Sequence, residues 1–298
     1  MMKTLLRPFR SSKSRMMSDK AMMSDKTMMP GKMSMSSDGS SMMAENPSMM
    51  GENPSMMTEN SSMMAENPPM MAENTEMMMD APMMMSKAPT VVELYQSQGC
   101  NSCPPANDNI IRLTEDPDML VLTYEVTYWD RLGWKDTFGN VAFDDRQREY
   151  CRALKKRGAY TPQVIVNGVE DGVGASQRDL NSILQKGTDK AAATHGTVSV
   201  TVSPSSGITV SGKALSSKAV VYLVRYDPRT IDIYIAHGEN SGRNLPHKNI
   251  VKDVTKLGSF NGGEQTYSIP QMAGDSGLKF AVLVQAGPGG SILGAARG

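Results

Sequence analysis

The stretch VVELYQSQGCNSCPPANDNIIRL, residues 91–113, places two cysteines between an apolar run and a segment with helical character. Residues 91–95 are expected to form a short buried strand, and a helix is expected from Pro104 onward, because proline is tolerated in a first helical turn. A cysteine at a helix start lies near unpaired amide groups and the positive end of the helix dipole, which favour the thiolate. We therefore predict that Cys100 is the attacking sulfur and Cys103 the resolving sulfur that closes the disulfide.

The C-x-x-C spacing has other uses, since half of a zinc site and a structural disulfide share it. The chain has no second C-x-x-C, and its third cysteine, Cys151, lies in a charged, helix-like segment. The three histidines, His195, His237 and His247, all lie far downstream of Cys103. These spacings disfavour zinc. A static disulfide remains an alternative, in which the protein is a non-catalytic interaction module.

The order of the expected elements resembles the thioredoxin superfamily. The first strand, the C-x-x-C and the helix are followed by an expected strand at residues 120–126, a helix at about 143–156, and the segment AYTPQVIVNGVEDG at residues 159–172. This last segment resembles the proline-led strand that faces the cysteines in thioredoxins and glutaredoxins. The resemblance implies a cis bond between Thr161 and Pro162, with Pro162 presenting backbone to an incoming thiol or extended chain. An ordinary turn proline is the alternative.

A narrower resemblance rests on five further segments. They are ELYQSQGCNSCPPAND (93–108), TYWDRLGWKDTF (127–138), YTPQVIVNG (160–168), HGENSGRNLPHKNIV (237–251) and AVLVQAGPGGSILGAA (281–296). Together they resemble a bacterial family of exported thioredoxin-like proteins that is described only as a domain of unknown function. The resemblance covers about residues 89–298 and implies an extracytoplasmic location, periplasmic or secreted, but no substrate. Gly99 stands where thioredoxins commonly carry a tryptophan.

Both tryptophans of the protein follow the second expected strand, on the side where thioredoxin-like folds place their active-site loops. The predicted substrate groove consists of Trp129, Asp130, Trp134 and Thr161. We expect Asp130 or Asp136 to accept protons during thiol chemistry. The alternative is a loop core in which the two indoles simply pack.

After residue 195 the sequence changes to short alternating runs such as TVSVTV, AVVYLVRY and TIDIYIAHG, separated by Pro, Gly, Ser and Asn. Such runs are typical of an all-β module. The sequence therefore predicts three parts: a disordered methionine-rich tail at 1–88, an α/β thioredoxin-like domain at 89–194, and a C-terminal all-β, sandwich-like domain at 195–298.

Most of the 28 methionines lie in the tail, in a repeat of about seven residues: MMAENPS, MMGENPS, MMTENSS, MMAENPP and MMAENTE. Interspersed prolines disfavour a continuous helix, and the lack of other large apolar residues favours disorder. Thioether sulfurs select Cu(I) over harder divalent metals, so paired methionines on one flexible chain are candidate copper ligands. These ligands are Met42, Met43, Met49, Met50, Met56, Met57, Met63, Met64, Met70 and Met71.

Copper handling is therefore the alternative to thiol–disulfide exchange, which itself requires no cofactor. In this alternative the tail gathers Cu(I) and passes it to Cys100 and Cys103, with His237 and His247 as further candidate ligands. A solvated loop is the simpler interpretation of both histidines. Repeat expansion without a ligand role, and an oxidant sink in which thioethers become sulfoxides, compete with copper binding in the tail.

Charge and hydropathy exclude several classes of partner. The 31 basic residues balance the 31 acidic ones. The sequence has no sustained basic patch of the kind that binds nucleic acid. No apolar run is long enough for a transmembrane segment. The N-terminal MMKTLLRPFRSSKSRMM lacks the apolar core of a secretory signal; its composition resembles a mitochondrial transit peptide, and a mispredicted start codon explains it equally well. The expected partners are protein thiols or disulfides, or a redox protein, with copper ions in the alternative.

Overall fold

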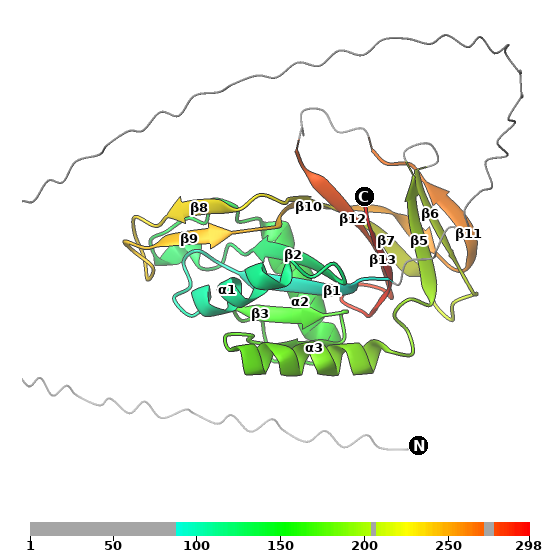
Figure 1. The fold of residues 1–298 in the computed structure, drawn as a ribbon, viewed down its shortest axis with the longest axis horizontal. Helices are drawn as coiled ribbons and strands as arrows, with labels where there is room; N and C mark the ends of the chain where they lie inside the picture. Colours follow the sequence, from blue (N-terminus) through cyan, green and yellow to red (C-terminus); the bar gives the residue numbers. More distant parts are fainter. Residues whose placement is uncertain (1–87, 204–206, 271–276) are drawn as a thin grey trace, which may run out of the picture. The chain divides into compact units, whose positions relative to one another are not determined.

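The computed structural model describes residues 88–203, 207–270 and 277–298, which belong to one compact unit (Figure 1). These residues form a mixed α/β fold with a large central sheet and few helices. The predicted tail lies, apart from Ala88, outside the described residues. The elements are β1 (Thr90–Gln96), α1 (Pro104–Leu113), β2 (Met119–Glu125), the 3-10 helix η1 (Asp130–Leu132), α2 (Val141–Ala153), β3 (Gln163–Val166), β4 (Glu170–Gly172), α3 (Gln177–Ala191), β5 (Val198–Ser203), β6 (Gly207–Gly212), β7 (Ala219–Asp227), β8 (Ile231–Tyr234), β9 (Asn244–His247), β10 (Ile250–Phe260), β11 (Gly263–Tyr267), β12 (Lys279–Gln285) and β13 (Ile292–Arg297).

The central sheet has eight strands among the described residues, in the order β13-β12-β7-β10-β2-β1-β3-β4. Strands β1 and β2 pair in parallel, because α1 carries the chain back from the end of one strand to the start of the other. Strand β3 pairs with β1 in the antiparallel direction. The strands expected at residues 91–95 and 120–126 are thereby confirmed as β1 and β2.

The helices cover both faces of this sheet. On one face, Phe143 and Tyr150 of α2 pack against Tyr95 of β1 and Tyr124 of β2. On the other face, helices α1 and α3 pack on alternate residues of the same strands, in a cluster that contains Val92, Leu94, Ile110, Val121, Val164, Val166, Leu180 and Ile183. Strands buried on both faces explain the continuous apolar runs in the sequence.

Local sequence signals set the helix starts. Helix α1 begins with proline, which lacks the N–H that a first turn leaves unpaired. The N-cap of α2 is Asn140, whose Oδ1 accepts a hydrogen bond from the Ala142 amide at 3.0 Å. The helix expected at 143–156 is confirmed, beginning two residues earlier than predicted and ending at Ala153.

The strands expected after residue 195 are present, and most of them belong to one of two sheets. Strands β7, β10, β12 and β13 extend the central sheet, and β10 joins β2 through the pair Ile250 and Thr123. Strands β5, β6 and β11 form a separate three-stranded sheet that packs on β7 and β12. The domain boundary at residue 195 stays a prediction; strands from both sides of it share the central sheet.

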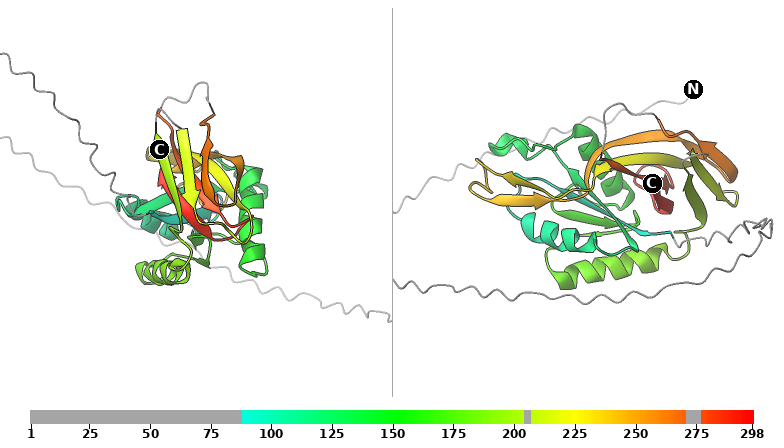
Figure 2. Two further views of the ribbon diagram at one scale, coloured as in Figure 1. Left: turned by 90° about the vertical axis from the view of Figure 1, so that its right-hand side faces the viewer. Right: turned by 45° about the horizontal axis from the view of Figure 1, so that its top comes forward.

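The hairpin of β8 and β9 lies at the same end of the compact unit as α1, and the three-stranded sheet lies at the opposite end (Figure 2). Within the described ranges, none of the helices combines the length and the apolar character needed to cross a membrane.

Candidate functional site

The two cysteines lie where β1 ends and α1 begins. Cys103 is the N-cap residue of α1, and its carbonyl oxygen accepts the amides of Ala106 and Asn107 at 3.1 and 3.0 Å. The Cys103 amide donates to the Cys100 carbonyl oxygen at 3.2 Å. Both thiols are free, and the two residues are 0% and 2% exposed. The structure therefore brings the predicted pair together at the start of a helix.

The surroundings of the two thiols differ. A hydrogen bond from the Cys103 thiol lowers the pKa of Cys100 to about 6, against the opposing effect of burial. Ser102 assists, because its Oγ lies 3.2 Å from the Cys100 sulfur. Burial raises the pKa of Cys103 well above the usual cysteine range, and the hydrogen bond that the Cys103 thiol donates to Cys100 raises it further. At neutral pH Cys100 is therefore the thiolate and Cys103 the thiol.

The loop before β3 faces Cys100. The Thr161–Pro162 peptide bond is cis, as expected from the resemblance to thioredoxins. The carbonyl oxygen of Thr161 lies 3.8 Å from the Cys100 sulfur. The side-chain Oγ1 of Thr161 accepts a hydrogen bond from Trp129 Nε1 at 2.8 Å. A Cβ on Gly99 would come within 3.3 Å of Trp129 Cβ, so a larger residue before Cys100 would require Trp129 to shift by a few tenths of an ångström.

The second tryptophan binds the loop that precedes the cysteines. Trp134 Nε1 donates to Gln98 Oε1 at 2.9 Å, and the Gln98 amide donates to Asp136 Oδ2 at 2.7 Å. Asp130 Oδ1 accepts the Asp136 amide at 3.1 Å. Three of the residues chosen from the sequence thus hold one loop against another. The hydrogen bonds of Trp134 and Asp130 go to Gln98 and Asp136 rather than to a sulfur.

A residue that the sequence analysis missed, Asn240, reaches the site from the loop between β8 and β9. It is 0% exposed, and its Nδ2 donates to the carbonyl oxygens of Gln98 and Cys100, both at 2.9 Å. Arg243 donates to Asn240 Oδ1 at 2.9 Å and holds the amide in this orientation. An asparagine among Gly and Ser is typical of a turn, so its neighbours give no signal of this role.

A buried pair of carboxyl groups, Glu125 and Asp136, lies beside the loop that carries the cysteines. Glu125, at the end of β2, accepts a hydrogen bond from Gln96 Nε2 at 2.8 Å, and its Oε2 has no hydrogen-bond partner among the described residues. Burial raises the pKa of Glu125 to about 7. Burial and the charge of Glu125 raise the pKa of Asp136 to about 8. The sequence analysis did not select Glu125, although a glutamate inside the apolar run VLTYEV (121–126) indicates a buried carboxyl group.

A small cavity lies between Cys103 and His247. It is lined by Gln96, Ser97, Cys103, Pro104, Asn107, Leu245 and His247. Its volume of about 10 Å³ is on the order of one water molecule. His247 Nε2 lies 3.7 Å from Glu125 Oε1, and burial lowers the pKa of the imidazole.

The two candidate histidine ligands lie in different environments. His237 is exposed, whereas His247 is buried with its ring edge-on to Phe138 and its Nδ1 2.9 Å from the Leu245 carbonyl oxygen. Among the described residues, no group of three or more His, Cys, Asp and Glu side chains could hold a metal ion. The ten methionines chosen as copper ligands lie outside the described residues. Copper binding therefore stays a prediction from the sequence.

Comparison with known proteins gives a family but no activity. The crystal structure of protein AGR_C_4864 from Agrobacterium tumefaciens is similar to this structure, with a TM-score of 0.58 and 29% identity over 71% of this chain and 94% of that chain. HBP35 of Porphyromonas gingivalis gives a TM-score of 0.47 and 14% identity over 71% and 75% of the chains, a likeness too weak to argue from. No curated protein matches. The model of the family described as Protein of unknown function (DUF1223) matches residues 91–285, and the chain therefore belongs to that family.

Proposed function

We propose that this protein is a thiol–disulfide oxidoreductase that acts on protein thiols through Cys100 and Cys103. The observation that carries the proposal is the pairing of two free thiols at the start of α1, with the first sulfur beside a backbone carbonyl of the loop before β3. One thiol is held as a thiolate by the other. This is the asymmetry that an attacking sulfur and a resolving sulfur require.

We further propose that residues 89–194 have a thioredoxin-like fold. The order β1, α1, β2, α2, β3, β4, α3 supports this, together with the parallel pairing of β1 with β2 and the antiparallel pairing of β3 with β1. The position of the cysteine pair between β1 and α1 supports it as well. An extracytoplasmic site of action belongs to the same proposal and rests on the family resemblance alone.

The proposed reaction exchanges one disulfide for another. The Cys100 thiolate attacks one sulfur of a substrate disulfide, forming a mixed disulfide and releasing a substrate thiolate that takes up a proton. Cys103 then loses its proton, and its sulfur attacks Cys100 Sγ. The mixed disulfide breaks, the second substrate thiolate leaves, and a Cys100–Cys103 disulfide remains. The substrate gains two electrons and the protein loses two.

The second step needs a proton acceptor, because burial holds Cys103 in its thiol form. Glu125 and Asp136 are suited to this task, since their raised pKa values of about 7 and about 8 allow them to exchange protons near neutral pH. The cavity between Cys103 and His247 provides space for a single water molecule as carrier.

The reduction potential of the pair tests the proposal directly. The purified protein is equilibrated in glutathione buffers, free thiols are trapped by alkylation, and Cys100 and Cys103 are read by peptide mass spectrometry. A potential between about −120 and −270 mV, the span of known exchangers, is expected. Cys151→Ser is the matched control, because this third cysteine is buried near Gln163 rather than at the helix start, and the potential should not change.

A potential below about −300 mV would instead assign Cys100 and Cys103 to a structural disulfide. A second measurement separates the two cases. Reduction of a protein disulfide such as that of insulin, with dithiothreitol as electron donor, should require Cys100 and proceed in the Cys151→Ser variant. Equal rates with wild-type protein and Cys100→Ser would overturn the proposal.

A further inference from the structure

A run of cations leads into the loop that faces Cys100. Residues 152–162 read RALKKRGAYTP, and the exposed cations among them are Arg152, Lys155, Lys156 and Arg157. Thr161, whose carbonyl oxygen lies 3.8 Å from the Cys100 sulfur, follows four positions after Arg157. Because four extended residues span at most about 14 Å, these charges lie within reach of a chain bound at Cys100.

Most of these cations have no acidic partner. Lys156 Nζ lies 2.6 Å from Asp171 Oδ1 and is neutralised there. Among the described residues, Arg152, Lys155 and Arg157 form no ion pair, and we call these three the basic surface.

The neighbouring acids have other partners. Glu170 pairs with Lys190, and Asp145 Oδ1 lies 2.8 Å from Arg148 Nη1. The charge of Glu149 acts on Tyr222 of β7. The basic surface therefore presents positive charge to solvent.

The end of α2 accounts for only one of these charges. Arg152 lies in the last turn, where the helix dipole favours a cation, but this effect fades beyond that turn. The amides of Lys155 and Lys156 donate to the carbonyl oxygens of Arg152 and Cys151 at 3.2 and 2.8 Å, which is a Schellman turn. Lys155 has φ 56°, a left-handed conformation that glycine adopts without strain. The turn therefore does not require a lysine at this position.

Hydrogen bonds to α2 hold the loop that follows the basic surface. Gln147 Nε2 donates to the Tyr160 carbonyl oxygen at 2.8 Å, and the Cys151 sulfur lies 3.5 Å from the Gly158 carbonyl oxygen. The Thr161 side chain is bound to Trp129. These contacts keep the basic surface at a fixed place relative to Cys100.

On the other loops around Cys100, acids and cations are in balance. In the loop between β8 and β9, Glu239 accompanies Arg243. In the loop after β2, two acids accompany two cations, namely Asp130, Asp136, Arg131 and Lys135. The excess of positive charge around Cys100 therefore comes from the basic surface.

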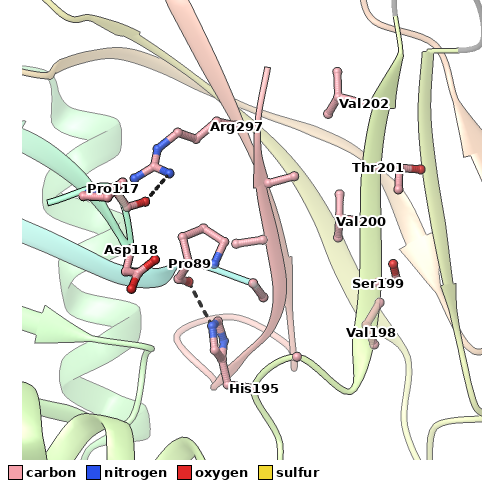
Figure 3. A pocket seen from close by; sticks show the side chains of 14 residues that line it. Pro89, Pro117, Asp118, His195, Val198, Ser199, Val200, Thr201, Val202 and Arg297 are labelled. Atoms are coloured by element: carbon pink, nitrogen blue, oxygen red, sulfur yellow. Dashed lines mark hydrogen bonds between the residues drawn. The ribbon is translucent and has the colours of Figure 1, made fainter. Parts of the chain in front are cut away.

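The cleft between β5 and β13, of about 770 Å³, offers no comparable charge (Figure 3). Its cation Arg297 donates to the Pro117 carbonyl oxygen at 2.8 Å, and the acid Asp118 lines the same cleft. His195 Nε2 lies 2.9 Å from the Pro89 carbonyl oxygen. The cleft is therefore not suited to recognise an acidic chain.

We propose that the basic surface selects protein disulfides that are flanked by Asp or Glu. This inference rests on the proposed thiol–disulfide exchange at Cys100 and adds the substrate class. A chain whose sulfur has reached Cys100 can place residues about four to six positions away over the basic surface. Opposite charges there speed the encounter and orient the bound chain.

Three peptides of one sequence, each with one intramolecular disulfide, test the preference. They carry Glu, Gln or Lys at the positions four to six residues outside each cysteine, and dithiothreitol is the electron donor. At low salt kcat/KM for the Glu peptide should exceed that for the Gln peptide at least about fivefold, and the Lys peptide should be slowest. At about 0.5 M sodium chloride the three values should converge, because salt screens exposed charges.

The two proposals fail differently in this assay. Equal kcat/KM values for the three peptides at low salt would overturn the acidic preference and leave the exchange reaction standing. No reduction of any of the three would count against the exchange reaction itself.

Charge variants assign the preference to the basic surface. The triple variant Arg152→Gln, Lys155→Gln and Arg157→Gln should reduce the three peptides at equal rates. The matched control removes the same charge from exposed positions elsewhere, through Lys186→Gln, Lys213→Gln and Lys218→Gln, and should keep the preference. A preference that survives the first variant, or that falls equally in both, would overturn the proposal.

Two further measurements separate charge from structure and from other partners. Lys155→Gly should weaken the preference while the free energy of unfolding is kept or rises, because glycine suits the left-handed turn. Binding to vesicles of phosphatidylcholine and phosphatidylglycerol that the first triple variant loses, with equal reduction of the three peptides by wild-type protein, would assign the basic surface to a membrane instead.

Discussion

At the scale of single residues, the candidate site gives two chemically identical side chains different pKa values. Cys100 and Cys103 are three positions apart, yet the pKa of one is lowered to about 6 and that of the other is raised well above its usual range. The cause is the direction of one hydrogen bond, from the Cys103 thiol to the Cys100 sulfur, combined with burial. This direction supports the proposal that Cys100, the residue nearer the N-terminus, is the attacking sulfur.

Alkylation of Cys100 should report this hydrogen bond. In wild-type protein the rate of reaction with iodoacetamide should be half-maximal near pH 6, because only the thiolate reacts. Cys103→Ala removes the donor, and the midpoint should move by about two units toward the ordinary value for cysteine. Cys103→Ser is the matched control, since a hydroxyl donates in the same position and should keep the midpoint low. Equal midpoints in the Ala and Ser variants would show that another group sets the pKa.

Glu125 should make the folded state less stable as pH rises. The native carboxyl has a pKa of about 7, whereas a glutamate in the unfolded chain ionises near 4.3, so between these values the native state holds the additional proton. Stability conferred by that proton is complete below the unfolded pKa and is lost as pH rises through the native pKa. Glu125→Gln removes this dependence.

At pH 8 the Glu125→Gln variant should therefore exceed wild-type protein in free energy of unfolding by on the order of 1–3 kcal/mol, and at pH 4 the two should agree. Urea titrations at pH 4, 6 and 8 measure the difference, to which Asp136 adds in the same direction, because the variant lacks the Glu125 charge that raises the pKa of Asp136. Glu264→Gln, on the exposed strand β11, is the control. A wild-type advantage at pH 8 would mean that Glu125 is held ionised.

At the scale of elements, the loop between β8 and β9 holds the cysteine loop in place. Asn240→Ala removes two donors and leaves the Gln98 and Cys100 carbonyl oxygens buried without them. The variant should lose about 1–3 kcal/mol of unfolding free energy. The cysteine loop should also open more often, so alkylation of Cys100 should accelerate. The control is Ser241→Ala, which removes a hydroxyl from an exposed neighbour and should change neither the unfolding free energy nor the alkylation rate by much. A similar loss of unfolding free energy in both variants would show that Asn240 has no special role in holding the cysteine loop.

Local elements were predictable from the sequence, and contacts between distant elements were not. The strand, the cysteine pair and the helix at 91–113 follow from propensity and spacing, which act over a few residues. Asn240 contacts Cys100 across 140 residues, and nothing near Asn240 specifies that contact. His247 illustrates the same limit: its type suggested a ligand, whereas packing against Phe138 places it in the interior beside Glu125.

At the scale of the whole compact unit, the parts before and after residue 195 share both a sheet and a core. The core cluster that contains Tyr95 and Tyr124 also contains Val224, Leu283 and other residues of the later strands. The buried ion pair of Arg146 with Glu93 has a further partner in Gln285 of β12, whose Oε1 accepts from Arg146 Nη1 at 3.2 Å. Asn249 Nδ2 donates to the Val121 carbonyl oxygen at 2.9 Å where β10 meets β2.

A fragment of residues 88–194 should therefore not fold alone. Without Gln285 the Arg146 guanidinium lacks one acceptor, and the face of β2 and α2 that meets the later strands would expose its aromatic side chains to water. Far-UV circular dichroism and amide exchange of the fragment should show no cooperative structure, and the intact protein should unfold in one calorimetric transition with equal calorimetric and van't Hoff enthalpies. Cooperative folding of the fragment would instead make residue 195 a true domain boundary and the shared cluster an interface. The first outcome is expected because the fragment loses the later strands' whole share of the core cluster, and the transfer of that apolar surface to water outweighs what a fragment of this size can compensate.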